Sequence, residues 1–163
     1  AGQVDSRVVS SLDIAPTAAA LAGAKMPNGT DGVDLMPYLA GGRKETPNQT
    51  LYWRSGANFA IRDGDWKMWV VNRAEPGERP RQGTAPAADG IEAKVSSLGK
   101  YVMLYDLKAD LGETKNLASA RPEVVAKLQA KIEAWDKSNA APQWTSMRQG
   151  VFQFEGQMLK VYP

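Results

Sequence analysis

Four side chains in the stretch LYDLKADLGETKNLA, residues 104 to 118, have types and a spacing that could do chemistry. They are Asp106, Asp110, Glu113 and Asn116, spaced by four, three and three residues. Such a set could ligate a metal ion or form a cluster of catalytic carboxylates. It could also bond the amides of a turn that leads a strand into a helix.

The spacing favours the turn. An EF-hand calcium loop needs acidic or amide ligands at alternate positions and a closing glutamate at the twelfth, and this stretch does not supply that pattern. We expect Asp106 to end the strand and Gly112 to turn the backbone. We expect Glu113 and Asn116 to bond amides of the loop. The sequence therefore predicts no metal ligand and no catalytic residue here.

The composition removes several other kinds of site. The 163 residues include no cysteine and no histidine, so thiolate zinc sites, thiol nucleophiles and the commonest general base are missing. The serines and threonines lack a histidine partner, and no phosphate-binding glycine motif occurs. The net charge of +2 gives no general attraction to nucleic acid. No apolar run approaches the roughly 20 residues of a membrane span. We expect neither a nucleic-acid partner nor a membrane span.

The N-terminal part of the sequence predicts little helical structure. The stretch VVSSLDIAPTAAALAG predicts a helix over about residues 14 to 22, capped by Asp13 and ended by Gly23. The Pro-, Gly- and Asp-rich stretch that follows predicts a loop with one helical turn at Leu35 to Leu39.

Strand patterns begin after Pro47. TLYWRSG predicts a short strand, and NFAIRDGDWKMWVVN predicts two strands around a type I′ turn at Asp63-Gly64. In these two strands Phe59 and Ile61 fall on one face, and Trp66, Met68 and Val70 follow the same alternation after the turn. KYVMLYDL should pair with this hairpin, and the apolar stripe of the segment that starts at Pro122 predicts a helix across one face of the sheet. A last hairpin is expected around Glu155-Gly156, and residues 73–94 are expected to form a long loop or a disordered insertion. The fold class is α+β, a small antiparallel sheet of about four strands packed against a C-terminal helix.

Aromatic side chains recur in the strand segments. They are Tyr52, Trp53, Trp66, Trp69, Tyr101 and Tyr105. Such a stripe is typical of sheet core, and a platform that stacks on sugars or bases is the alternative.

Several segments, taken in order, resemble the C-terminal part of a sulfatase of the alkaline phosphatase superfamily. The segments are VSSLDIAPTAAALAG, DGVDLMPYLAGG, LYWRSGANFAIRDGDWKM and LYDLKADLGETKNLA, and the likeness runs from about residue 8 to residue 144. Two departures from the family pattern are Leu111, where proline is usual, and Arg54-Ser55, where acidic or histidine residues are usual.

The resemblance implies a division of the chain into three parts. Residues 1–47 would be the C-terminal remnant, a helix and a loop, of the α/β catalytic domain. Residues 48–144 would be the sulfatase C-terminal subdomain, and residues 145–163 a tail with the last hairpin. The family's formylglycine-forming C/S-x-P-x-R motif, its calcium ligands and its catalytic histidine and lysine groups all lie upstream, and no stretch here matches them. The fragment would be inactive alone, with Ca²⁺ and formylglycine in the parent enzyme.

The resemblance also implies where this chain would work. It would pack on the missing catalytic domain and shape the cleft for a sulfate ester. The first choice for substrate contact is the WRSGAN loop, with Trp53 as a sugar platform and Arg54, Ser55 and Asn58 as polar contacts.

Alternatives stay open. One is a free-standing module that binds a carbohydrate or a protein, and another is the C-terminal part of a related phosphodiesterase or phosphonate hydrolase. A fragment predicts exposed apolar surface around Ile14, Leu21, Val33 and Leu35, which self-association could cover. The localisation is open, a periplasmic or secreted parent being one option.

Overall fold

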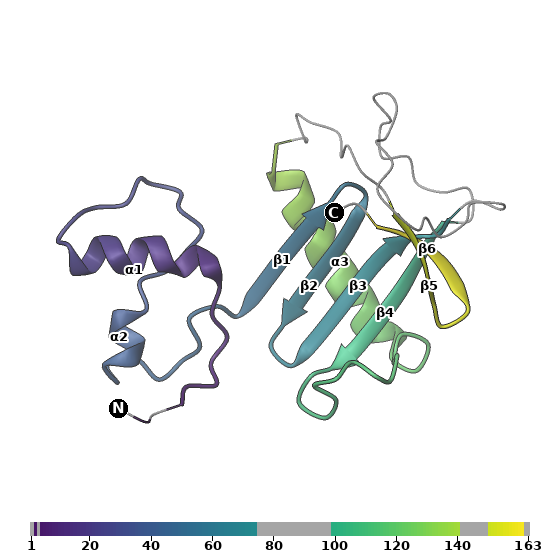
Figure 1. Cartoon of the computed structure of the whole chain (residues 1–163), viewed down its shortest axis with the longest axis horizontal. Helices are drawn as coiled ribbons and strands as arrows, with labels where there is room; N and C mark the ends of the chain where they lie inside the picture. Colours follow the sequence, from purple (N-terminus) through teal and green to yellow (C-terminus); the bar gives the residue numbers. More distant parts are fainter. Residues whose placement is uncertain (1, 3, 75–98, 141–149, 162–163) are drawn as a thin grey trace. The chain divides into compact units, whose positions relative to one another are not determined.

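The structure, a computed structural model, describes residues 2, 4–74, 99–140 and 150–161. The chain divides into two compact units, an N-terminal unit Ala1–Thr50 and a C-terminal unit Leu51–Pro163 (Figure 1). The elements are a 3-10 turn Ser11–Asp13, helices α1 Ile14–Leu21, α2 Met36–Leu39 and α3 Pro122–Ser138, and strands β1 Thr50–Ser55, β2 Asn58–Asp63, β3 Trp66–Asn72, β4 Lys100–Asp106, β5 Gly150–Phe154 and β6 Gln157–Val161. None of the helices formed by the described residues is both long and apolar enough to cross a membrane.

The N-terminal unit contains both helices predicted for it. Helix α1 ends before Gly23, whose φ of 69° is the left-handed conformation that glycine adopts without strain. The predicted role of Asp13 as the side-chain cap of α1 is wrong. Its carboxylate instead turns back to the backbone N–H of Ser10, closing a capping box around the 3-10 turn.

Asp13 is the buried centre of the N-terminal unit. Its carboxylate accepts hydrogen bonds from the backbone N–H of Ser10 (2.7 Å), the backbone N–H of Val33 (3.0 Å) and the side-chain amide of Asn48 (2.7 Å). The chain at Gly32 passes so close to the 3-10 turn that a Cβ there would lie 2.0 Å from the carbonyl oxygen of Leu12. The carboxylate of Asp13 therefore joins three segments of this unit, which contain Ser10, Val33 and Asn48.

The C-terminal unit is built on a sheet with the strand order β1-β2-β3-β4. The register pairs Ile61 with Met68 and Met68 with Leu104, so these three residues share one face, as the alternation predicts. Strand β2 ends at Asp63, which is paired with Trp66, so the turn residues are Gly64 and Asp65. The prediction of a type I′ turn at Asp63-Gly64 is wrong, because only Gly64 of the two turn residues has a positive φ.

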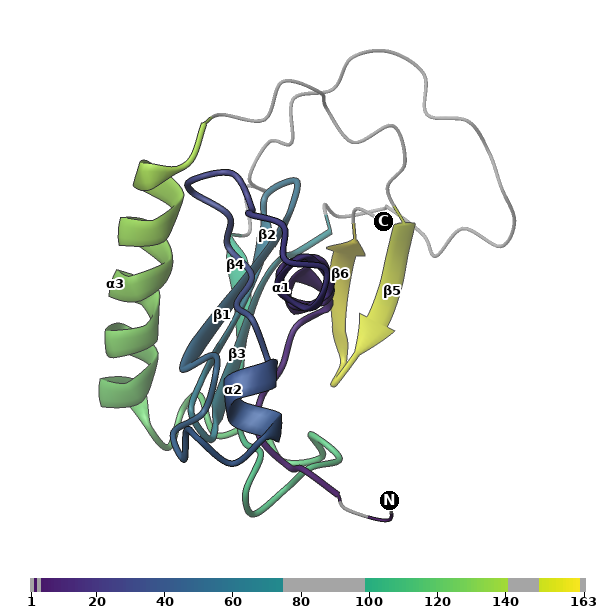
Figure 2. The ribbon, with the colours of Figure 1, turned by 90° about the vertical axis from the view of Figure 1, so that its left-hand side faces the viewer.

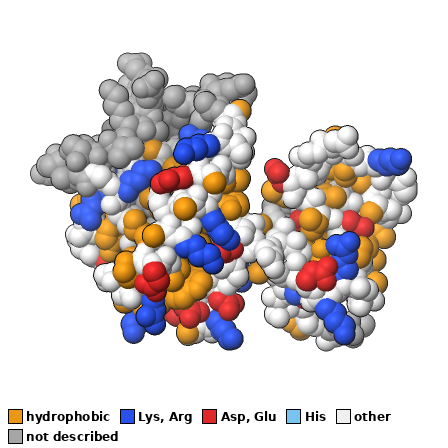
Figure 3. Space-filling model, turned by 180° about the vertical axis from the view of Figure 1, so that it is seen from behind, with side chains coloured by type: hydrophobic (Ala, Val, Ile, Leu, Met, Phe, Trp, Pro, Cys, Tyr) orange, Lys and Arg blue, Asp and Glu red, His pale blue; other side chains and the backbone are white. Residues whose placement is uncertain are grey.

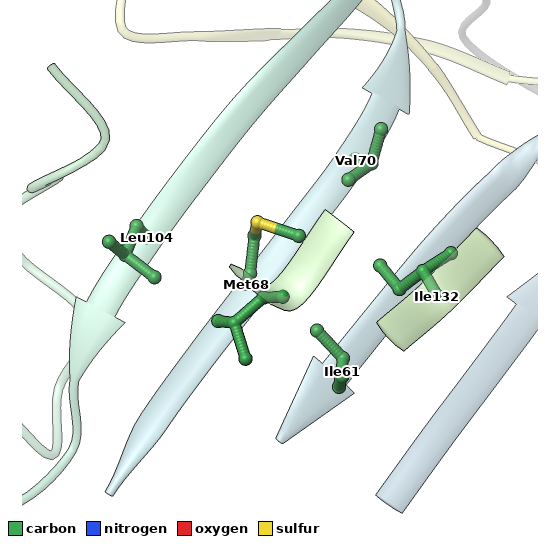
Figure 4. Packing of buried hydrophobic residues seen from close by; sticks show 6 residues of the cluster. Ile61, Met68, Val70, Leu104 and Ile132 are labelled. Atoms are coloured by element: carbon green, nitrogen blue, oxygen red, sulfur yellow. The ribbon is translucent and has the colours of Figure 1, made fainter. Parts of the chain in front are cut away.

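Helix α3 covers one face of this sheet. Leu128 and Ile132 of the helix pack on Ile61, Met68 and neighbouring side chains of the strands (Figure 4). The other buried members of this cluster are Val70 and Leu104. The arrangement confirms the α+β class, with a small antiparallel sheet against a C-terminal helix.

The hairpin of β5 and β6 lies on the opposite side of the sheet from α3 (Figure 2). Leu159 of β6 is fully buried against Val71, Met103 and Tyr105, which point away from the helix. The hairpin predicted at Glu155-Gly156 is confirmed, and both turn residues have positive φ. A loop was predicted for residues 73–94. Its residues from 75 onward lie outside the described residues.

Apolar side chains remain exposed on the N-terminal unit. Ile14 is 67% and Leu21 68% exposed, while Val33 and Leu35 are half-buried. Figure 3 shows hydrophobic side chains on the surface of this smaller body. The expected exposed apolar surface is therefore found at Ile14 and Leu21 but not at Val33 and Leu35.

Candidate functional site

The acidic stretch that begins at the end of β4 forms a turn, and the carboxylates of Asp106 and Asp110 are bonded by the backbone of the turn itself. Asp106 accepts from the backbone N–H groups of Lys108 (3.0 Å) and Ala109 (3.3 Å). Asp110 accepts from the backbone N–H groups of Lys115 and Thr114, both at 2.8 Å. The bond from Lys115 is the main cause that holds the pKa of Asp110 below its ordinary value. These bonds support the structural interpretation of the stretch.

Glu113 differs from the expectation in both conformation and partners. It is Glu113, with a φ of 54°, that takes the left-handed conformation, whereas Gly112 does not. Its carboxylate bonds side chains rather than loop amides, accepting from the Lys67 ammonium (2.5 Å) and from the indole N–H of Trp69 (3.1 Å). The described residues contain no group of three or more Asp, Glu, His or Cys side chains able to hold a metal ion.

Asn116 attaches the stretch to the edge of the sheet. Its side-chain oxygen accepts from the backbone N–H groups of Leu104 and Ala118, both at 3.0 Å. The N–H of Leu117 donates to the carbonyl of Leu104 at 2.7 Å. This confirms the turn role expected for Asn116, which leads β4 toward α3.

Replacing Asn116 with alanine should lower the free energy of unfolding by about 2 to 4 kcal/mol, because two backbone donors lose their acceptor. Urea denaturation followed by tryptophan fluorescence would measure the change. Asn139→Ala, at the exposed end of α3, is the control and should change stability by less than about 0.5 kcal/mol. Equal effects of the two substitutions would contradict the role of Asn116.

Three of the four residues proposed for substrate contact lie in β1 and are divided by its pleat, and the fourth, Asn58, begins β2. Arg54 lies on the helix side, where its guanidinium pairs with Asp136 of α3 at 2.6 Å. Trp53 is 48% exposed. Because adjacent residues of a strand point to opposite faces of the sheet, Trp53 and Ser55 lie on the face opposite Arg54. Asn58 is buried, accepting from the N–H of Asn72 (2.9 Å) and donating to the carbonyl of Lys160 (2.7 Å).

A hollow of about 590 Å³ opens on the sheet face opposite α3. Strands β3 and β4 supply its floor, and the hairpin and the turn after β4 supply its walls. The lining residues are Ser55, Asn58, Trp69, Val71, Met103, Tyr105, Gly112, Glu113, Phe152 and Phe154. The sequence did not single out this hollow. The signal was present, since MWVV and YVMLY are apolar at consecutive positions, which indicates burial on both faces.

Two tyrosines of β4 on this face have raised pKa values. Burial raises the pKa of Tyr105 to about 12. The hydrogen bond that Tyr101 donates to Glu155, at 2.7 Å, raises the pKa of the Tyr101 hydroxyl. Both phenols therefore stay protonated at neutral pH, and they cannot act there as bases.

The chain is similar to known sulfatases. No model of a known protein family matches it. It is 38% identical to human arylsulfatase A over 136 residues, which are 77% of this chain and 26% of that protein. Bovine arylsulfatase A is 38% identical over 128 residues, covering 74% of this chain and 24% of that protein. The chain thus spans about a quarter of the length of these curated relatives.

Solved structures extend the likeness to the fold. The crystal structure of Ps i-CgsB aligns with a TM-score of 0.58 and 26% identity, covering 86% of this chain and 27% of that one. The phosphonate monoester hydrolase of Agrobacterium radiobacter has a TM-score of 0.52 at 21% identity over 99% of this chain and 30% of that one, which shows the shared fold.

The strand order and the covering helix define an α+β fold of the kind found in these solved structures. Together with the identity to arylsulfatase A, they identify the chain as a sulfatase-like C-terminal part.

Proposed function

We propose that this chain is the C-terminal part of a sulfate ester hydrolase and is inactive by itself. In this proposal the chain packs on the catalytic portion of the parent enzyme and shapes one wall of its substrate cleft. The observation that carries the proposal is the 38% identity to arylsulfatase A over 77% of this chain, which corresponds to 26% of that protein.

The residues of this chain do not fit the groups that a sulfatase uses. Formylglycine forms from the cysteine or serine of C/S-x-P-x-R, and no stretch of the 163 residues has that pattern. The acidic residues of the turn after β4 are bonded to backbone amides, Lys67 and Trp69, which leaves no open carboxylate cluster among them for calcium. We therefore assign formylglycine and Ca²⁺ to the catalytic portion and derive no chemical step in this chain.

We propose different roles for the four residues of the WRSGAN loop. Trp53 and Ser55 are exposed and would face the cleft, with Trp53 as a platform for a sugar ring. Arg54 and Asn58 would position the loop, because the first is paired with Asp136 and the second is bonded to backbone groups. Truncation of Trp53 would then raise the KM of the parent for a sulfated sugar.

We also propose the division into a catalytic-domain remnant, residues 1–47, a subdomain, residues 48–144, and a tail, residues 145–163. The exposed Ile14 and Leu21 support this interpretation, because the catalytic portion would cover them in the parent. In the isolated chain the same side chains would favour self-association.

The reading frame upstream of Ala1 tests the proposal. We expect it to continue and to encode C/S-x-P-x-R with acidic calcium ligands. A threonine or serine nucleophile outside that motif would instead indicate a phosphodiesterase or phosphonate hydrolase. A start codon directly before the codon of Ala1 would contradict the fragment proposal and favour the free-standing module.

A further inference from the structure

Asn28 lies at the tip of the loop that follows α1. It is exposed and forms a turn with Gly29, and the hydroxyl of Thr30 donates across this turn to the carbonyl of Pro27 at 2.8 Å. Gly29 has a left-handed φ of 83°, and a Cβ added to it would meet nothing within 4 Å. Among the described residues, neither the Asn28 side chain nor the backbone N–H of Gly29 has a hydrogen-bond partner. Both groups are therefore open to water.

The other five asparagines of the chain are held in place. Asn58 and Asn72 are buried. The side chains of Asn48, Asn116 and Asn139 are hydrogen-bonded to the rest of the protein. None of the five is followed by glycine. Asn28 is thus distinguished from them both by its neighbour in the sequence and by its surroundings in the structure.

We propose that Asn28 is a site of spontaneous deamidation. The backbone nitrogen of Gly29 bonds to the side-chain carbonyl carbon of Asn28, and the side-chain nitrogen leaves as ammonia with the proton of that backbone amide. Water then opens the resulting succinimide ring at either carbonyl, which leaves aspartate or isoaspartate at this position. Asparagine is a thermolabile residue, and glycine has no side chain to block the approach of its nitrogen. The reaction adds one negative charge, taking the formal net charge from +2 to +1.

The base of the same loop is held by contacts that this reaction leaves in place. A Cβ at Gly32 would lie 2.0 Å from the carbonyl oxygen of Leu12, so the two backbones are closely packed. The backbone N–H of Val33 donates to the carboxylate of Asp13 at 3.0 Å. The new charge therefore stays at the exposed tip, and the N-terminal unit remains folded around Asp13.

Peptide mass spectrometry of the full chain can test this site. Trypsin cuts after Lys25 and Arg43, and the peptide between them contains no glutamine and no asparagine other than Asn28. The purified chain and a synthetic peptide of residues 24–33 would be incubated under the same mildly alkaline conditions. Deamidation replaces an amide by a carboxyl group, and the resulting gain in mass gives the rate.

Asn28 in the folded chain should react within about threefold of its rate in the synthetic peptide, because an exposed turn with few hydrogen bonds is weakly protected. The other five asparagines should react at least about tenfold more slowly than Asn28. Retention of the Asn28 amide while the synthetic peptide reacts would overturn the proposal, as would faster reaction at another asparagine. Hydrogen exchange at the Val33 amide should be unchanged by the reaction, and faster exchange would overturn its confinement to the tip.

Two variants assign the ammonia that the chain releases. Asn28→Gln should lower the release at least about fivefold, because glutamine must close a larger and less favourable ring. Gly29→Ala should also lower it, since a methyl group crowds the attacking nitrogen, and circular dichroism would check the fold because alanine is strained at this φ. Asn139→Gln, at the exposed end of α3, is the matched control and should leave the release unchanged. Unchanged release from Asn28→Gln would contradict the assignment.

Discussion

Replacing Ile61 with alanine should lower the free energy of unfolding of the C-terminal unit by about 3 to 5 kcal/mol. Ile61 is fully buried at the centre of the cluster between the sheet and α3. The substitution removes three carbon atoms, and the surrounding Met68, Leu128 and Ile132 are held by their own elements and can fill the space only in part. Because small domains are stable by only about 5 to 15 kcal/mol, the substitution would remove a large part of the stability of the unit.

A graded series at the same position separates packing from other effects. Ile61→Val removes one methylene and should cost about 0.5 to 1.5 kcal/mol. Urea denaturation followed by circular dichroism of α3 would measure both variants. The account of the core would fail if Ile61→Ala were no more destabilising than Ile61→Val.

The second large effect is expected at Asp13. Asp13→Ala should destabilise the N-terminal unit by about 3 to 5 kcal/mol, because three donors lose a buried charged acceptor. This unit has few buried apolar side chains among its described residues, Tyr38 being the main one. Its segments would therefore separate, and hydrogen exchange at the amide of Val33 would report the loss.

Asp31→Ala is the matched control for Asp13→Ala. Asp31 is an exposed aspartate close in sequence to the same loop, and its truncation should leave the exchange of the Val33 amide unchanged. Similar exchange in the two variants would show that Asp13 does not hold the unit together.

Local sequence patterns were sufficient to predict the sheet and its covering helix. Alternation in NFAIRDGDWKMWVV placed Ile61 and Met68 on one face, and the stripe from Pro122 predicted α3. The turn at Gly64 was misplaced by one residue, because the Asp-Gly pair is a strong turn signal and the register also depends on the pairing of Asp63 with Trp66.

The role of Asp13 could not be predicted from its neighbours. An aspartate before an alanine-rich run has the pattern of a helix cap. Its actual partners Val33 and Asn48 lie 20 and 35 residues further along the chain. Long-range hydrogen bonds of this kind leave no periodic pattern in the sequence.

The candidate site was predictable in part. Strand alternation could have separated Arg54 from Trp53 and Ser55, because adjacent strand residues point to opposite faces. The bond from Asn58 to the carbonyl of Lys160 could not have been foreseen, since it joins residues 102 positions apart. Likewise the hollow forms only where the hairpin of β5 and β6 meets β3 and β4.

Turnover of a chromogenic aryl sulfate by the isolated chain and by the full-length parent tests the central claim most directly. The assay would be run with calcium and with a chelator. We predict calcium-dependent hydrolysis by the parent and none by residues 1–163 alone. Calcium-dependent turnover by the isolated chain would contradict the claim that its chemistry resides in another portion of the enzyme.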